Sequence, residues 1–223
     1  MNYGCRINLD FPRPDRALVE KFRGLPVANI DDNMWRMAAL DAAIRPLNKA
    51  PLAGTAFTVR VPAGDNLMFH KAMNLAQPGD VVVIDAGGFC ERAIFGELMA
   101  TYCKLRRLAG IIVDGCVRDY DALSQMDFPI YARGVTPNGP YKNGPGEIGF
   151  TVTAGSQVIC PGDILVGDGD GVVVIKPEDA PELLEKTLAV SAKESTIMET
   201  MLRDGTYIRP WVDEKLREIG CSF

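Results

Sequence analysis

The pair Arg118-Asp119 has the residue types of a carboxylate- and metal-binding site. It follows the apolar run Gly110–Asp114, which indicates a buried strand, and ligand sites of α/β sheets gather where such strands end. A guanidinium offers a planar fork that suits a carboxylate, and a carboxylate can bind a hard divalent cation. A structural interpretation is open as well. Asp119 could cap a helix through Tyr120–Met126, and Arg118 could be solvated.

The segment Gly96-Glu97-Leu98-Met99 could supply the other half of such a site. It lies near the start of the strongest predicted helix, over Ile94–Leu108. The first amides of a helix have no internal partners and attract anions, and a glycine allows a ligand to approach the backbone closely. The alternative is a glycine tolerated in the helix, with Glu97 solvated.

Other features of the sequence exclude several kinds of site. The sequence has one histidine, His70, so a three-histidine zinc site is impossible, and no nucleophile-elbow pattern supports a serine triad around it. A metal must therefore be held mainly by oxygen, which favours magnesium, manganese or calcium. Gly144–Gly149 satisfies G-x-G-x-x-G. However, Phe150–Thr153 after it indicates a strand and not the helix that a dinucleotide site requires.

The elements that would position these residues form a βαβ pattern. Val81–Asp85 is a continuous apolar run, typical of a strand buried on both faces, and Ala86–Gly88 breaks it. This strand, the helix and the strand Gly110–Asp114 follow one another within about 35 residues, so they predict a right-handed βαβ unit. The ends of the two strands should bring the two segments above together.

The sequence pattern changes after residue 128. A glycine- and proline-rich loop is predicted over Gly134–Gly149, followed by short antiparallel strands separated by tight turns. Pro78-Gly79-Asp80 and Pro161-Gly162-Asp163 each precede a predicted strand, and we interpret both as turns. A helix with apolar residues on one side is predicted from Glu178 to about Leu202. We therefore divide the chain into an α/β domain over residues 1–177 and a C-terminal helical extension over residues 178–223.

The composition is that of an ordinary globular protein. Of the 223 residues 47% are hydrophobic and 24% charged, with a net charge of −5, which argues against nucleic-acid binding. No apolar run approaches the roughly 20 residues of a membrane span, and the first residues have no signal-peptide pattern. The six cysteines contain no C-x-x-C pair, which favours small core residues in a reducing compartment over disulfides. We expect a cytoplasmic protein.

Together these segments resemble the RraA-like family, which includes 4-hydroxy-4-methyl-2-oxoglutarate/4-carboxy-4-hydroxy-2-oxoadipate aldolases and the regulator of ribonuclease activity A. The resemblance spans roughly Asn29 to Pro177. Its motifs are Gly79–Asp85, Gly96-Glu97, Ala109–Asp119 and Pro161–Val174. An acidic residue, twenty intervening residues and then Arg-Asp is the aldolase signature, and Glu97 to Arg118-Asp119 has that spacing. Where the family often has aspartate after the glycine, Glu97 adds one methylene.

The resemblance implies a layered α/β/β/α fold of the swivelling-domain type and a role for each site residue. Asp119 would bind a divalent metal, Mg²⁺ or Mn²⁺, directly. Glu97 would hold metal-bound water, while Arg118 and the backbone of Gly96, Glu97, Leu98 and Met99 would bind the pyruvyl group. Glu194, or else Glu199, would come from the C-terminal helix of a neighbouring subunit.

The activity implied is that of a class II pyruvate aldolase acting on a small 2-oxo acid, with oxaloacetate decarboxylation as a second activity. Subunits of the family assemble as trimers or hexamers. The alternative within the family is a protein inhibitor of a ribonuclease. The C-terminal extension favours the aldolases, because the ribonuclease regulators are shorter.

Overall fold

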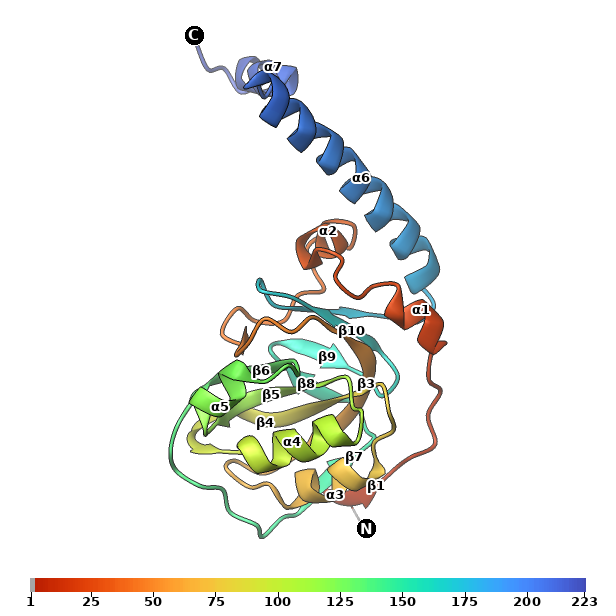
Figure 1. Ribbon diagram of the computed structural model, residues 1–223, viewed down its shortest axis with the longest axis vertical. Helices are drawn as coiled ribbons and strands as arrows, with labels where there is room; N and C mark the ends of the chain where they lie inside the picture. The colour runs from red at the N-terminus through yellow and green to blue at the C-terminus, as the bar shows by residue number, and fades with distance from the viewer. Residues whose placement is uncertain (1–2) are drawn as a thin grey trace.

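Alternating burial along the central strands divides the domain into layers. In strand β4 (Asp80–Ala93), Val82 and Ile84 pack on one side of the sheet, whereas Val81 and Val83 pack on the other, as the two-residue period of a strand requires. The computed structural model describes residues 3–223 and is shown in Figure 1.

Three clusters of buried side chains separate the layers and confirm the α/β/β/α architecture. The first lies between the central sheet and helices α3, α4 and α5. The second lies between that sheet and strands β8 to β11, and the third between strands β10 and β11 and helices α1, α2 and α6. The helices are α1 (Arg16–Glu20), α2 (Val27–Asp32), α3 (Leu67–Leu75), α4 (Glu97–Leu105), α5 (Tyr120–Gln125), α6 (Ala180–Asp204) and α7 (Pro210–Glu218).

The sheet has a parallel centre with antiparallel additions. Strands β3 to β6 are parallel neighbours joined through α3, α4 and α5, which confirms the predicted βαβ unit. Strands β7 and β10 run antiparallel to β3. The remaining strands are β1 (Cys5–Ile7), β2 (Arg45–Pro46), β3 (Leu52–Arg60), β5 (Gly110–Val117), β6 (Ile130–Val135), β7 (Gly146–Ile148), β8 (Val152–Ala154), β9 (Gln157–Ile159), β10 (Ile164–Gly167) and β11 (Val172–Ile175).

Several predicted boundaries are wrong. Strand β4 does not end at the glycines but continues to Ala93 through two register shifts against β5. Helix α4 consequently begins at Glu97 and not at Ile94, whose amide still donates to the carbonyl of Cys116. Strand β7 lies inside the predicted loop, and the strand expected over Phe150–Thr153 begins later, at Val152.

The two proline–glycine–aspartate segments are turns of the same construction. Gly79 and Gly162 have φ values of 94° and 95°, a region that favours glycine. The aspartate that follows each glycine accepts a hydrogen bond from the amide three residues earlier, at 2.8 Å in both turns. A neighbouring cation, Arg13 or Lys176, neutralises each carboxylate.

All six cysteines are free. Cys103 and Cys116 are buried, as core cysteines should be, and burial raises the pKa of each thiol to about 12. Cys5, Cys90 and Cys221 are exposed, so the expectation of core residues holds for only part of the set.

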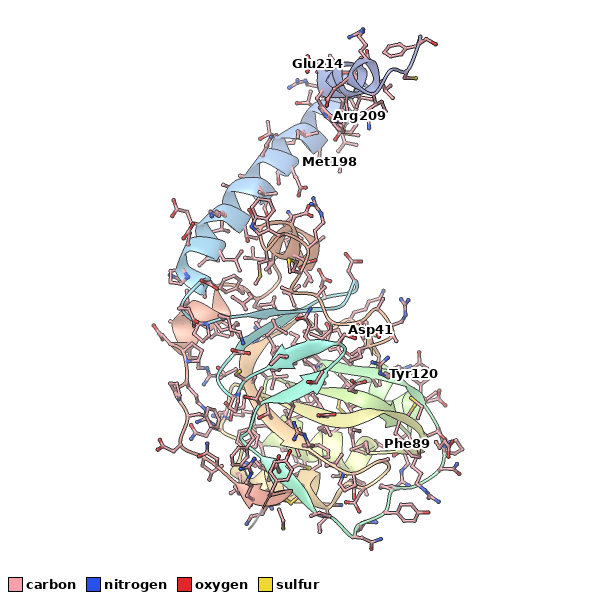
Figure 2. The ribbon with its side chains drawn as sticks, turned by 180° about the vertical axis from the view of Figure 1, so that it is seen from behind. Asp41, Phe89, Tyr120, Met198, Arg209 and Glu214 are labelled. Carbon is pink, nitrogen blue, oxygen red and sulfur yellow. The ribbon has the colours of Figure 1, made fainter. Side chains whose placement is uncertain are left out.

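The C-terminal extension leaves the domain along α6. The buried residues of this helix all lie in its first two turns, namely Ala180, Leu183, Leu184 and Thr187. Farther along, Asn29 of α2 donates hydrogen bonds to Ser191 and Glu194. Beyond Glu194 the helix projects into solvent, and Met198 stands clear of the domain (Figure 2), with 55% of its surface exposed. None of the described helices is both long and apolar enough to cross a membrane.

Candidate active site

Asp119 lies just past the end of β5, in a backbone conformation that directs it away from its own helix. Its φ and ψ angles are 58° and 41°, and its side chain makes no capping hydrogen bond to α5. Instead Asp119 Oδ2 accepts a hydrogen bond of 3.0 Å from the amide of Glu97, the first residue of α4. Asp119 thus occupies the N-cap position of α5, but the interpretation that its side chain caps this helix is wrong.

The start of α4 fits closely around this carboxylate. A Cβ atom placed on Gly96 would overlap Asp119 Oδ2 and lie 2.9 Å from Arg118 Cγ, so only glycine leaves room for the two side chains. The amide of Glu97 is used by Asp119. The next two amides, of Leu98 and Met99, have no protein acceptor within residues 3–223, as expected for the first turn of a helix.

These groups surround a cavity of about 290 Å³ at the carboxyl ends of β4 and β5. The predicted residues Gly96, Leu98, Met99, Arg118 and Asp119 all line it. The sequence-based expectation that the two segments meet is thus met by the geometry. A volume of this size accommodates a small organic acid.

The opposite wall of the cavity was not predicted. It consists of Asn66, His70, Gly139, Pro140 and Lys142. Asn66 is 2% exposed and donates to the carbonyl of Ile94 at 2.8 Å. Its Oδ1 atom is the buried side-chain acceptor without a partner in the described part of the chain, and such an atom is costly to leave unpaired.

The loop that carries Lys142 is fixed by its backbone. Asp65, which is 3% exposed, accepts hydrogen bonds from the amides of Asn143 (2.6 Å) and Gly144 (3.0 Å) with one carboxylate oxygen. Its other oxygen accepts from the amide of Leu67 at 2.8 Å. On the far side, Arg92 donates to the carbonyl of Gly139 at 2.8 Å. The loop is therefore held over the cavity from both ends.

The cavity contains more cationic than anionic groups. Arg118 Nε lies 3.8 Å from Asp119 Oδ2, and nearly half of each side chain is exposed. Partial burial lowers the pKa of His70, and the nearby positive charge of Lys142 lowers it further. His70 is consequently neutral at pH 7. Arg118 and Lys142 then leave a positive field that favours an anionic ligand.

Three predicted carboxylates do not line this cavity. The side chain of Glu97 is exposed beside it, and only the amide of this residue takes part in the arrangement described above. Glu194 lies on α6, on the other side of the domain from α4 (Figure 1), where its Oε2 accepts a hydrogen bond of 2.6 Å from Asn29. Glu199 lies farther along the same projecting helix.

The donor set suits a cation that keeps most of its water. Among the described residues there is no group of three or more His, Cys, Asp or Glu side chains that could hold a metal. Asp119 Oδ2 is engaged by the Glu97 amide, but no protein donor within the described chain reaches Oδ1. One free carboxylate oxygen plus water matches the coordination habits of Mg²⁺.

The family model and the related sequences that match this chain point to the same family. The family model described as RraA-like (Aldolase/RraA) matches residues 27–174. A Halalkalibacterium halodurans protein named "Putative 4-hydroxy-4-methyl-2-oxoglutarate aldolase" is 37% identical over 199 residues, covering 89% of this chain and 95% of that protein.

Two solved structures extend this likeness. An unusual member of the RNase ES inhibitor RraA protein family from Streptomyces coelicolor has a TM-score of 0.74 and 26% identity, covering 83% of this chain and 98% of that one. The RNA-processing inhibitor RraA from Thermus thermophilis has a TM-score of 0.62 and 26% identity, covering 68% of this chain and 92% of that one.

Proposed function

The chain belongs to the RraA-like family, and from this premise we propose that it is a divalent-metal-dependent pyruvate aldolase. Its substrates would be 4-hydroxy-4-methyl-2-oxoglutarate or 4-carboxy-4-hydroxy-2-oxoadipate, cleaved to pyruvate and a second 2-oxo acid. The observation that carries the proposal is the meeting of Arg118, Asp119 and the start of α4 at one cavity.

Substrate binding follows from the cations and amides of the cavity. Arg118 and the free amides of Leu98 and Met99 bind the carboxylate and oxo oxygens of the pyruvyl end, because both kinds of donor favour anionic oxygen. Lys142 adds positive charge on the facing wall. The distal part of the substrate extends toward solvent.

The reaction requires one proton to leave and one carbon–carbon bond to break. Water held by Glu97 accepts the proton of the tertiary hydroxyl. The bond electrons then pass to the pyruvyl oxo oxygen, which gives pyruvate enolate and the second 2-oxo acid, and the enolate takes a proton at its methylene carbon. Arg118 stabilises the developing negative charge, a contribution of roughly 3 kcal/mol for one well-placed donor.

Asp119 is the residue that would hold the metal, through the oxygen that the Glu97 amide leaves free. Mg²⁺ or Mn²⁺ bound there would supply a Lewis acid for the oxygen that becomes negative. Oxaloacetate can lose carbon dioxide to give the same enolate, so we propose oxaloacetate decarboxylation as a second activity.

A carboxylate from a second subunit would complete the site. Glu194 cannot reach the cavity of its own chain, because α6 leaves the domain on the opposite side (Figure 1). The exposed distal half of α6 offers apolar side chains, Met198 and Leu202 among them, that are 55% and 80% exposed in the single chain. We propose that these pack in a homotrimer or homohexamer and bring Glu194, or else Glu199, to a neighbour's Asp119.

The test is a pyruvate-release assay on 4-hydroxy-2-oxo diacids, with and without chelator. We expect chelator to abolish turnover and Mg²⁺ or Mn²⁺ to restore it. Full activity after exhaustive chelation, together with trapping of substrate by borohydride, would indicate a lysine Schiff base and refute the proposal.

The likeness to the Thermus RNA-processing inhibitor favours a second candidate function, binding to a ribonuclease. That structure covers only 68% of this chain, whereas the Halalkalibacterium halodurans relative covers 89%. A pull-down with a purified ribonuclease of the kind that RraA inhibits, run beside the pyruvate assay, separates the two functions.

A further inference from the structure

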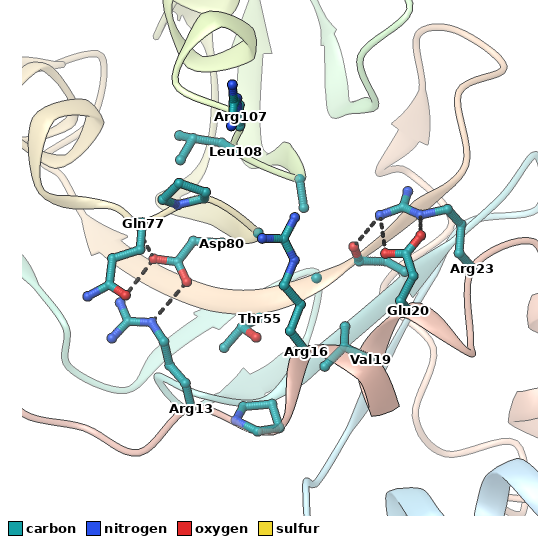
Figure 3. Close-up of a pocket in the computed structure, with 16 residues that line it drawn as sticks. Arg13, Arg16, Val19, Glu20, Arg23, Thr55, Gln77, Asp80, Arg107 and Leu108 are labelled. Atoms are coloured by element: carbon teal, nitrogen blue, oxygen red, sulfur yellow. Dashed lines mark hydrogen bonds and ion pairs between the residues drawn. The ribbon is translucent and has the colours of Figure 1, made fainter.

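A second cavity lies at the opposite edge of the central sheet from Arg118 and Asp119. Its volume is about 410 Å³, and it is bordered by Asp80 at the start of β4 and by Leu108 and Ala109 just before β5 (Figure 3). The candidate active site is formed where the same two strands end. The two cavities share no lining residue.

This second cavity is strongly basic. Its lining contains four arginines, namely Arg13, Arg16, Arg23 and Arg107, but only two carboxylates, those of Glu20 and Asp80. The lining therefore carries a net charge of +2 in a chain whose total is −5. A concave surface of one charge sign concentrates ions of the other sign.

Two of the arginines are occupied by these carboxylates. Arg13 donates to both oxygens of Asp80 at 3.0 Å, a bidentate pair. Arg23 pairs with Glu20 and also donates to the carbonyl of Ala53 at 3.0 Å. The two ion pairs stand at opposite sides of the cavity in Figure 3 and fix its walls.

Arg16 and Arg107 form no ion pair with either of these two carboxylates. Within the 16 lining residues drawn in Figure 3, neither guanidinium makes a hydrogen bond or ion pair, and that of Arg16 extends into the space between the two ion pairs. A Cβ atom placed on Gly79 would lie 3.6 Å from Arg16 Nε. The absence of a side chain at Gly79 keeps the space beside this guanidinium open.

We propose that this cavity binds a small polyvalent oxyanion, with phosphate or carboxylate groups bridging Arg16 and Arg107. A free guanidinium matches such groups through two parallel hydrogen bonds, and the volume lies within the range of small-molecule sites. The net charge of +2 comes from Arg16 and Arg107, because the other two arginines are paired with carboxylates. The site is independent of the proposed aldolase activity.

Titration calorimetry on the full chain tests the site, with pyrophosphate and succinate as separate probes at constant ionic strength. We expect one of them to bind once per chain. Arg16→Gln and Arg107→Gln should each weaken binding roughly tenfold, as the loss of one charge-assisted hydrogen-bonding group does. Arg45→Gln removes the same charge from an exposed position on β2 and should leave binding unchanged.

Two further variants test whether binding depends on this cavity and on the shape of the guanidinium. Arg118→Gln should retain binding, because Arg118 belongs to the other cavity, and Arg16→Lys should bind less well than the unaltered chain because the planar fork is lost. Binding of pyrophosphate alone would identify a phosphorylated ligand, and binding of succinate alone a dicarboxylate. The proposal is overturned if neither probe binds, if both glutamine variants bind normally, or if Arg118→Gln abolishes binding.

Discussion

The carboxylate of Asp119 is positioned by the backbone of Glu97. The 3.0 Å hydrogen bond between Asp119 Oδ2 and the Glu97 amide joins the residue after β5 to the first residue of α4. The positive end of the α4 dipole meets a negative charge at this contact. One oxygen of Asp119 is thereby oriented, and the other is left for a ligand.

Gly96→Ala tests the fit of this contact. The added methyl group would overlap Asp119 Oδ2, so the carboxylate must move, and a misplacement of about 1 Å can cost roughly 100-fold in rate. We expect kcat for pyruvate release to fall by about that factor while the fold persists by circular dichroism. Gly169→Ala is the matched control, since its Cβ would have no neighbour within 4 Å. Equal activity of the two variants would contradict the geometry.

Asp119→Asn separates metal binding from the structural role. Asparagine keeps an oxygen that can accept from the Glu97 amide and tolerates positive φ, so the free energy of unfolding should change by less than about 1 kcal/mol. Turnover and binding of Mn²⁺, measured by electron paramagnetic resonance, should be lost. Turnover that survives in Asp119→Asn, combined with a lower melting temperature, would mean that the residue is only structural.

Arg118→Lys asks whether charge alone suffices. A lysine keeps the charge but loses the planar fork, so we expect kcat/KM to fall nearly as far as in Arg118→Ala, by about 100-fold. Arg45→Lys is the control on an exposed strand. Recovery of most activity in Arg118→Lys would show that bidentate binding is unnecessary.

His70 predicts a pH dependence of stability. Burial and Lys142 lower its pKa in the folded protein below the ordinary value of 6.5. The unfolded chain therefore binds more protons between those two pKa values, and stability falls as the pH drops through this window. His70→Gln should flatten the curve of unfolding free energy against pH there. Because His70 is the one histidine in the sequence, an unchanged curve would contradict the lowered pKa.

The shared site is tested by mixing two inactive proteins. Asp119→Ala lacks the proposed metal ligand, and Glu194→Ala lacks the carboxylate proposed to come from the neighbouring chain. After subunit exchange of equal amounts, verified by mass spectrometry, about a quarter of the sites would contain both intact residues, so activity should return toward roughly a quarter of normal in an oligomer that mixes at random. Full activity of Glu194→Ala alone, or verified exchange without recovery, would contradict a shared site.

The sequence predicted the wall of the candidate site that contains Gly96, Arg118 and Asp119. It missed the opposite wall for a physical reason. Gly96, Arg118 and Asp119 adjoin regular elements, so strand ends and helix starts determine where they lie. Lys142 reaches the cavity because Asp65 binds amides almost 80 residues away along the chain, and Asn66 is held there by the carbonyl of Ile94. Such long-range contacts leave no local periodicity to detect.

The same distinction applies to boundaries and to the extension. The turns at Gly79 and Gly162 were predictable because their glycine–aspartate chemistry is local. Strand β4 continues past its glycines because it pairs with β5. Taken alone, the glycines indicate that the strand ends there. On α6 the pattern predicted the helix, but the hydrogen bond between Glu194 and Asn29 joins residues 165 positions apart.

The carboxylate of Asp65 has an evolutionary consequence. Asp65 holds the loop through the backbone amides of Asn143 and Gly144. This anchoring therefore does not depend on most of the side chains in the loop. Substitutions at Gly139, Pro140 or Lys142 can thus alter the cavity wall while the face formed by Gly96, Arg118 and Asp119 stays intact. The architecture allows new ligand preferences to arise by point mutation, without rebuilding that face.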